Sequence, residues 1–522
     1  MYSLLAAIRE CRPFSSLPSP KLWQGQNKMK TRFLTTLLIL FLLLPAFGTI
    51  PATTVWEMRP SVGSDTNGGG FDSTGSGTDL SQFNNKNAAA CSSCQSATVN
   101  ISTTDAVANG TTTVTSATGN FSAAITGNIV FFSGGTGSIT AQWRRATFVS
   151  ATSMTIDASI AASTGMTMNI GGALLTPTQL NTNMQLVAGN QAWIKATATI
   201  TFSSTFSFTP SAGSTNLLPV ISGYGSTRGD NLQVTFQETA GSIFLDIGGG
   251  ANRGAQLRNV IIDCNGQSSS IGLAIDGPGN SAANISVKGC SGTYGIGFFD
   301  IDNFCFNCSV TTQSGAGNAF FWNNNAQSSC IVCAAYSNTT TTASGIFNLG
   351  NPRGTCNVCI AANNTGSSTV DGFNIGSAQG TAIILNSVAV NNGEDGLKTQ
   401  IGAQSVIVLN SVFYGNGRYG MGCSGCTNAQ IGAFMNYNAY GANVTANLNL
   451  ITAGANDQIL TANPFVNSAG NNFAPNNTAG GGALLRALGF PGSLLVGGTG
   501  FATIGALAAA SGGAAVGFPI IQ

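Results

Sequence analysis

The chain reads IILNSVAVNNGEDGLKTQIGAQSVIVLNSV over residues 383–412, and this stretch decides the fold. A short apolar strand ends in Asn-Ser-Val at 386–388, an Asn-rich turn follows, and the next apolar strand ends in Asn-Ser-Val at 410–412. One structural unit repeated at a fixed spacing is the sequence signature of a solenoid. Similar segments end at residues 264, 290, 308, 333, 359, 386 and 410, in steps of 24 to 27 residues with one step of 18. These steps predict coils of about 25 residues.

A second set of residues recurs with the same period as these strand ends, and each set is expected to form a column along the stack of coils. A Gly that opens an apolar strand recurs at Gly272, Gly295, Gly345, Gly372, Gly396 and Gly420. Asn-rich turns lie between the columns, at Asn338, Asn363-Asn364, Asn391-Asn392 and Asn416. Two or three short strands per period with Asn and Gly corners predict an all-β parallel β-helix, whose coils stack about 4.8 Å apart. Stacked Asn side chains at the corners can hydrogen bond to one another along the stack.

Composition excludes several functions. The 522 residues include no His, so His-dependent catalysis and imidazole zinc sites are impossible. Because 19 Lys and Arg balance 18 Asp and Glu, we expect no nucleic-acid partner. Only 7% of residues are charged, which argues against a helical bundle, whereas 43% are hydrophobic and can form a large core.

The N-terminal residues have the pattern of an export signal. Lys30 and Arg32 precede an apolar run over 33–44, and Pro45 and small residues follow. This pattern predicts a signal peptide over 29–48, an over-extended start over 1–28 and a secreted or cell-surface protein. The alternative is a membrane anchor, but the run is short for a span, so we expect no stable membrane insertion after cleavage. Of 13 Cys, Cys11 precedes the signal, and the even number that remains fits disulfides.

The remaining chain divides by composition into three parts. Residues 49–172 are expected to form a leading segment and a small β subdomain, because short β-branched strands alternate there with Gly and Ser turns. Residues 173–460 are assigned to the β-helix. Residues 461–522 end in a Gly/Ala-rich tail and are expected to cap the helix, with an anchor or a self-assembly surface as alternatives.

Three stretches resemble the pectate-lyase-like right-handed parallel β-helix superfamily. They are the turn at 63–68, the Asn-Ser-Val coils described above, and the segment Asn463-Pro464-Phe465-Val466 with Asn472-Phe473. Together they span most of residues 55–480. The resemblance implies a right-handed parallel β-helix, but this superfamily includes lyases, hydrolases, epimerases, adhesins and tailspikes, so it does not imply one activity.

Cysteines form five C-x-x-C pairs, at 91/94, 305/308, 330/333, 356/359 and 423/426. In an extended strand, residues i and i+3 point to opposite faces about 10 Å apart, too far for a disulfide or a shared metal. We therefore expect vertical pairing or thiol stacking between coils for Cys305, Cys308, Cys330, Cys333, Cys356 and Cys359. The turn-like pairs Cys91/Cys94 and Cys423/Cys426 could close locally. A metal or iron–sulfur array on the stacked pairs is the alternative, and export disfavours it.

The candidate catalytic cluster lies in the last coils. Asp371 and Asp395 each precede a column Gly, one coil apart, and should project from the same face with Glu394, Lys398 and Arg418 nearby. Adjacent carboxylates perturb each other's pKa or share a cation, so Ca²⁺ is a possible ligand, and Lys398 could act as a base or a charge partner. The superfamily's lyases are similar in using acidic calcium ligands with an Arg or Lys base. Alternatively, these residues are ordinary Asp-Gly turns.

Two functional hypotheses remain. The first is an exported, non-catalytic protein that binds an extracellular polysaccharide or a cell-surface glycan, as adhesins do; the low charge, the absence of His and the polar surface favour it. The second is a polysaccharide lyase or glycoside hydrolase acting at Asp371, Asp395, Lys398 and Arg418.

Overall fold

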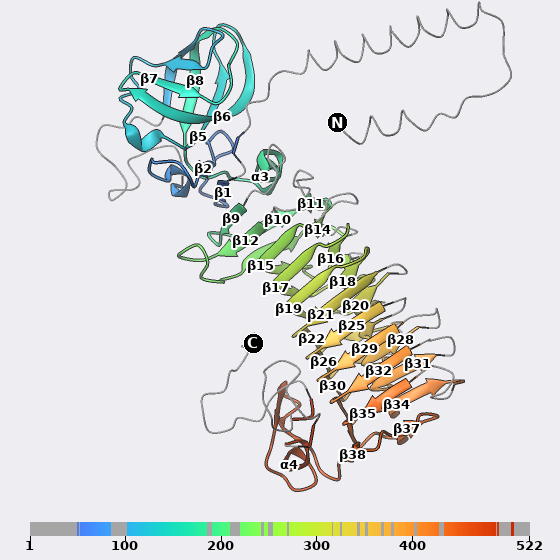
Figure 1. Cartoon of the computed structure of the whole chain (residues 1–522). Coiled ribbons are helices and arrows are strands. Elements are labelled where there is room, and N and C mark those ends of the chain that lie inside the picture. The colour runs from blue at the N-terminus through green and yellow to red at the C-terminus, as the bar shows by residue number, and fades with distance from the viewer. Residues whose placement is uncertain are drawn as a thin grey trace, which may run out of the picture. The chain divides into compact units, whose positions relative to one another are not determined.

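A computed structural model shows that the chain is nearly all β-structure, as predicted (Figure 1). It describes residues 50–51, 53–84, 102–184, 191–208, 220–241, 245–248, 254–268, 271–315, 317–323, 326–341, 345–349, 353–366, 370–376, 381–400, 405–426, 433–486, 488–489 and 503–505. The predicted signal peptide, Cys91, Cys94 and most of the Gly/Ala-rich tail lie outside these residues. No helix in the described part of the chain is long and apolar enough to cross a membrane.

The small β subdomain is a closed antiparallel barrel of six strands in the order β3-β4-β7-β6-β5-β8. Its strands are β3 (Ser102–Ala108), β4 (Thr113–Thr115), β5 (Ile129–Gly134), β6 (Ile139–Ser150), β7 (Ser153–Ile156) and β8 (Ser163–Ile170). Its core includes Phe132, Met154, Met166 and Met168, which are fully buried. Buried Met154 and Ile156 alternate with partly buried residues along β7, so one face of this strand points inward.

The leading segment joins the barrel to the β-helix. It contains β1 (Thr54–Met58), β2 (Gly70–Asp72), the short helices η1 (Leu80–Gln82) and η3 (Ala123–Ile125), and helix α3 (Pro177–Met184). In the 63–68 turn, Asp65 accepts hydrogen bonds from the backbone N–H groups of Leu175 and Thr176 at 2.9 and 3.0 Å. This turn therefore fastens the chain just before α3.

Parallel strands stacked coil on coil form the β-helix, in two long sheets (Figure 1). After β1, the first sheet contains β9 (Gln191–Lys195), β10 (Ile200–Phe202), β12 (Val220–Tyr224), β13 (Val234–Glu238), β15 (Gln256–Asp263), β17 (Ser281–Lys288), β19 (Phe304–Thr311), β21 (Gln327–Ile331), β22 (Ala334–Tyr336), β25 (Arg353–Asn357), β26 (Ile360–Ala362), β29 (Thr381–Leu385), β30 (Val388–Val390), β32 (Ser405–Leu409), β33 (Val412–Tyr414), β35 (Ala433–Asn436), β36 (Ala439–Gly441) and β38 (Gln458–Ile459). The second contains β11 (Phe206–Phe208), β14 (Leu245–Ile247), β16 (Ile271–Ile275), β18 (Tyr294–Phe298), β20 (Asn318–Trp322), β24 (Phe347–Asn348), β28 (Phe373–Ile375), β31 (Leu397–Gln400), β34 (Tyr419–Ser424) and β37 (Ala446–Asn449). The short strands β23 (Thr339–Thr340) and β27 (Thr365–Gly366) pair at one corner.

Register pairs define the coil length. Residues that share one inward column are Leu257, Ala282, Cys305, Cys330, Cys356, Ile384, Val408 and Met435, which lie 23 to 28 residues apart. This spacing confirms the predicted period. The 18-residue step between 290 and 308 arose because sequence analysis aligned Cys290 with Cys308. The register partner of Cys308 on the preceding coil is Ile285.

A left-handed residue bends each coil of the first sheet at one equivalent position. Positive φ angles between 51° and 59° occur in this column, at Asn259, Asn284, Asn307, Val332, Val358, Asn386, Asn410 and Tyr437. The bend breaks the alternation of the strand, so residues on both sides of it point inward. The prediction that i and i+3 of a C-x-x-C pair face opposite ways was therefore wrong, because it assumed an unbroken strand.

Asn side chains form ladders at a corner of the coils, as predicted. Asn338, Asn364, Asn392 and Asn416 each donate from Nδ2 to Oδ1 of the Asn one coil further on, the last acceptor being Asn443, at 2.8 to 3.1 Å. Four of these residues are buried. The ladder satisfies polar groups that would otherwise destabilise the corner.

The C-terminal segment packs against the outer face of the first sheet. The hairpin of β39 (Phe465–Asn467) and β40 (Asn472–Pro475) precedes the short helix α4 (Gly482–Leu485). Phe465, Phe473 and Leu485 form a core cluster with Val388 and Val412 of β30 and β33. The described residues Phe465, Phe473 and Leu485 thus cover the side of the last coils.

Candidate functional site

The predicted acidic cluster comes together at one edge of the second sheet. Asp371 precedes β28, Glu394 and Asp395 precede β31, and Arg418 precedes β34, so consecutive coils place them side by side. The backbone N–H of Asp395 donates to Oδ1 of Asp371 at 3.1 Å. Asp371 and Asp395 are 0% and 1% exposed, and Glu394 is 9% exposed.

Two cations pair with the three carboxylates. Arg418 Nη2 lies 2.6 Å from Oδ2 of Asp395, and its Nη1 lies 2.7 Å from Oε1 of Glu394. Lys398 Nζ lies 3.2 Å from Oε2 of Glu394 and 3.6 Å from Oδ2 of Asp371. Because the carboxylates already have these partners, the cluster as arranged does not fit a calcium ion.

Burial raises the pKa of Asp371, and the neighbouring carboxylates raise it further, to about 8. The positive charge of Lys398 lowers this pKa, but by less than these two effects raise it. A protonated Asp371 could donate a proton at neutral pH. However, the atoms that would donate or accept protons are held within the ion-pair network. The same contacts also form a buried ionic network that links three successive coils and can stabilise their stacking.

A groove that sequence analysis missed lies over β15, β17 and β19. It has a volume of about 850 Å³. Register explains its shape, because Gln256, Ser281 and Phe304 are aligned across the three strands, as are Arg258, Ala283 and Phe306. The small side chains of the middle strand thus lie between larger side chains on both neighbours.

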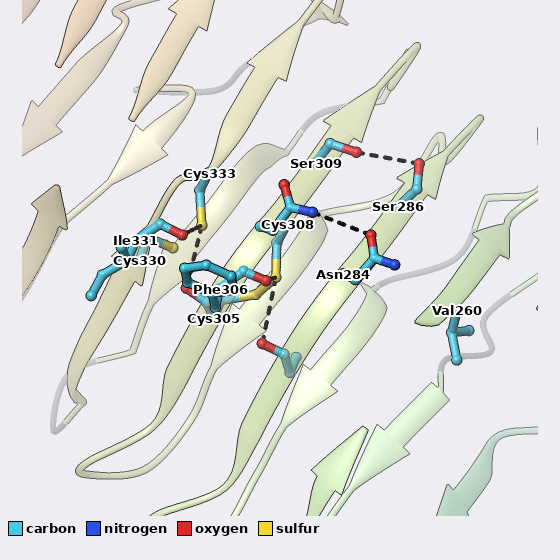
Figure 2. Close-up of a disulfide and its surroundings, with 12 residues drawn as sticks. Val260, Asn284, Ser286, Cys305, Phe306, Cys308, Ser309, Cys330, Ile331 and Cys333 are labelled. Atoms are coloured by element: carbon cyan, nitrogen blue, oxygen red, sulfur yellow. Dashed lines mark hydrogen bonds between the residues drawn. A yellow bond between two sulfur atoms is a disulfide. The ribbon is translucent and has the colours of Figure 1, made fainter. Parts of the chain in front are cut away.

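Apolar and hydrogen-bonding groups both line the groove. Phe304 and Phe306 are stacked with an interplanar angle of 13°, and Leu232 contributes a third apolar side chain. A ladder of amides forms part of the lining, because Asn284 donates to Asn259 Oδ1 at 2.8 Å. The Oδ1 of Asn284 accepts in turn from Asn307 at 3.2 Å, the bond drawn at Asn284 in Figure 2. Among the lining residues that the structure describes, Arg258 carries a charge and none is acidic.

A buried ionic network near the start of the β-helix was also missed. Glu57 is 0% exposed and accepts hydrogen bonds from Arg59, Arg228 and the hydroxyl of Tyr224. Arg228 also reaches Asp79 at 2.9 Å, whereas Asp230 in the same loop accepts backbone N–H bonds. Burial, followed by the charge of Glu57, raises the pKa of Tyr224. This network ties β1 and η1 to the loop after β12.

The disulfides differ from the predicted pattern. Cys264 and Cys290 form a bond between coils, whereas Cys305 and Cys308 pair within one C-x-x-C motif. Cys423 and Cys426 also close locally, as their turn-like sequence indicated. Cys330, Cys333, Cys356 and Cys359 are buried free thiols stacked on successive coils.

Comparison with known proteins adds a likeness of structure. No family model and no curated protein matches the chain. Similar solved structures include pectate lyase Pel9A, with 13% identity over 65% of this chain and 92% of that one, at a TM-score of 0.45. The A-module of Azotobacter vinelandii mannuronan C-5 epimerase AlgE6 has 15% identity over 57% of this chain and 80% of that one, at 0.35. The PL6 family alginate lyase AlyGC has 9% identity over 56% of this chain and 54% of that one, at a TM-score of 0.27.

These likenesses assign no activity to this chain. The class is defined by its own strand pairings, which form a parallel β-helix. The features in which it differs from a plain solenoid are the six-stranded barrel before the helix, the groove over β15, β17 and β19, and the column of cysteines in the core.

Proposed function

We propose that this is an exported protein that binds a polysaccharide in the groove over β15, β17 and β19 without cleaving it. The observation that carries the proposal is the composition of that groove. Stacked phenyl rings offer apolar faces to sugar rings, while amides and Arg258 offer hydrogen bonds to hydroxyl or carboxylate groups.

The groove is suited to an extended chain. Two strand spacings, about 9.6 Å, separate β15 from β19, and small residues form the floor between them. The groove therefore follows the direction of β17 and offers room for one polymer chain. Glycoside hydrolysis generally requires a pair of carboxyl groups at the scissile bond, which the described residues of the lining do not provide.

Binding can be tested on a panel of neutral and acidic polysaccharides, with retention and released oligosaccharides measured together. Phe306→Ala should weaken binding of the retained polysaccharide at least tenfold. The matched control is Phe434→Ala in β35 of the same sheet, because Phe434 is 55% exposed against 39% for Phe306 but lies outside the groove lining. Equal binding by wild type and Phe306→Ala would exclude the groove.

A polysaccharide lyase or hydrolase acting at the acidic cluster is the second candidate. It is supported by the raised pKa of Asp371 and by Lys398 beside it. Oligosaccharides with an unsaturated end would favour a lyase. Their loss in Asp371→Asn, with retention in Asp302→Asn, would assign the reaction to this cluster, since Asp302 is an exposed turn residue elsewhere.

A further inference from the structure

Six cysteines occupy three successive coils in the core of the β-helix. Cys305, Cys330 and Cys356 are register partners on β19, β21 and β25. The second cysteine of each motif, Cys308, Cys333 or Cys359, follows three residues later. All six are at most 1% exposed.

The backbone of the three motifs is bent in the same way. The third residue of each motif, Asn307, Val332 or Val358, has a φ angle of 52°, 56° or 59°. This bend turns both cysteines of a motif inward, and it is the geometry in which Cys305 and Cys308 are bonded with a Cα–Cα distance of 6.1 Å.

The second sulfur of each motif also has the same position relative to the preceding coil. Sγ of Cys308 lies 3.8 Å from the carbonyl oxygen of Ala282, which is the register partner of Cys305. Sγ of Cys333 and of Cys359 lie 3.6 and 3.7 Å from the carbonyl oxygens of Cys305 and Cys330, as Figure 2 shows for Cys333. The free thiols thus repeat the placement found in the bonded motif.

We propose that Cys330 joins Cys333 and that Cys356 joins Cys359, so that the oxidised chain carries a ladder of three stacked disulfides. Each closure forms one S–S bond, breaks two S–H bonds and releases two protons and two electrons. The oxidant is the disulfide of a thiol–disulfide oxidoreductase, which is reduced to a dithiol. Because the thiols are buried, closure precedes the final packing of the coils.

Two other arrangements compete with this ladder. Cys333 makes thiol contacts with Cys330 on its own coil and with Cys359 on the next, so vertical bonds could form instead. The sulfurs of Cys305, Cys308 and Cys333 lie within 4.8 Å of one another, so a reduced stack could hold a soft metal ion. The local bond already present in the first motif favours the ladder.

Trypsin separates the possibilities without reduction. Lys288, Arg353 and Lys398 bound two peptides, 289–353 and 354–398, with no Lys or Arg inside either. The full chain, produced with export, is denatured with an alkylating agent, digested and analysed by mass spectrometry. The ladder predicts that 354–398 is unlinked, not alkylated, and two hydrogen masses lighter than its dithiol form.

Peptide 354–398 joined to 289–353 would demonstrate vertical bonds and overturn the proposal. Alkylation of both Cys356 and Cys359, or a stoichiometric metal in the undigested protein, would also overturn it. Cys333→Ala provides a second test of the pairing. Its readout is the identity of the alkylated cysteine, so the variant need not be as stable as the wild type. Under the ladder, the new alkylated thiol is Cys330, whereas vertical pairing would expose Cys359.

Discussion

The backbone N–H of Asp395 donates to the side chain of Asp371 on the preceding coil, at 3.1 Å. This contact fixes the two buried carboxylates beside each other, where Lys398 and Arg418 pair with them. The cluster therefore couples the stacking of three coils to the protonation of Asp371.

Stability should depend on pH through Asp371. Its pKa is raised to about 8 in the folded chain from an ordinary value of 3.8, so between these values the folded state binds the extra proton. The free energy of unfolding must then fall as pH rises through this window, by up to about 1.4 kcal/mol per pH unit. Denaturant unfolding from pH 5 to pH 9 should show a smaller decline in Asp371→Asn than in wild type. Asp302→Asn is the control, and equal slopes in all three proteins would contradict the raised pKa.

Removal of Arg418 should destabilise the last coils. Asp395 is 1% exposed and loses a bidentate partner in Arg418→Ala, leaving a buried carboxylate without its cation. Because Arg418 is itself partly exposed, we expect a loss of about 2 kcal/mol rather than the larger values for fully buried pairs. Lys288→Ala breaks the more exposed pair with Asp263 and should cost under about 1 kcal/mol. Similar losses from both variants in urea unfolding would show that burial does not set the cost.

Val332 occupies a left-handed position that disfavours a β-branched residue. Its φ is 56°, whereas the same column holds Asn307 on the preceding coil. Val332→Asn relieves this strain and offers an amide to the ladder that ends at Asn307, so the chain should become about 1 kcal/mol more stable. Val332→Ala provides the comparison, because it removes the branched side chain without adding an amide. A midpoint of chemical unfolding for the Asn variant below that of the Ala variant would contradict this explanation.

The Cys264–Cys290 bond should stabilise the folded chain more than the local bonds. It closes a loop of 26 residues between coils, while Cys423 and Cys426 are three residues apart. On the loop-entropy account, replacing Cys264 and Cys290 together by Ala should cost about 3 kcal/mol, and replacing Cys423 and Cys426 should cost less. Unfolding in denaturant without reductant measures both, and the reverse order would contradict the assignment of the vertical bond.

The acidic cluster was predictable because its residues occupy equivalent positions in coils of regular length. Asp371 and Asp395 lie 24 residues apart and precede equivalent strands of two successive coils. The stacking of these coils makes the two residues neighbours. The groove was not predictable, because it requires the correct register of β15, β17 and β19. Aligning Cys290 with Cys308 displaced that register, which hid the row of Arg258, Ala283 and Phe306.

The sequence by itself determined the parallel β-helix, its period and the Asn ladder, because these follow from a local unit repeated along the chain. Only the tertiary structure decided which cysteines pair, since the left-handed bend at Asn307 turns Cys305 and Cys308 to the same side. It also decided that Arg228 meets Glu57, which Arg59 also contacts, because residues 171 positions apart become neighbours only when the leading segment packs on the first coils. Local patterns specify which strand face is buried, whereas side-chain chemistry between coils depends on register and on single backbone angles.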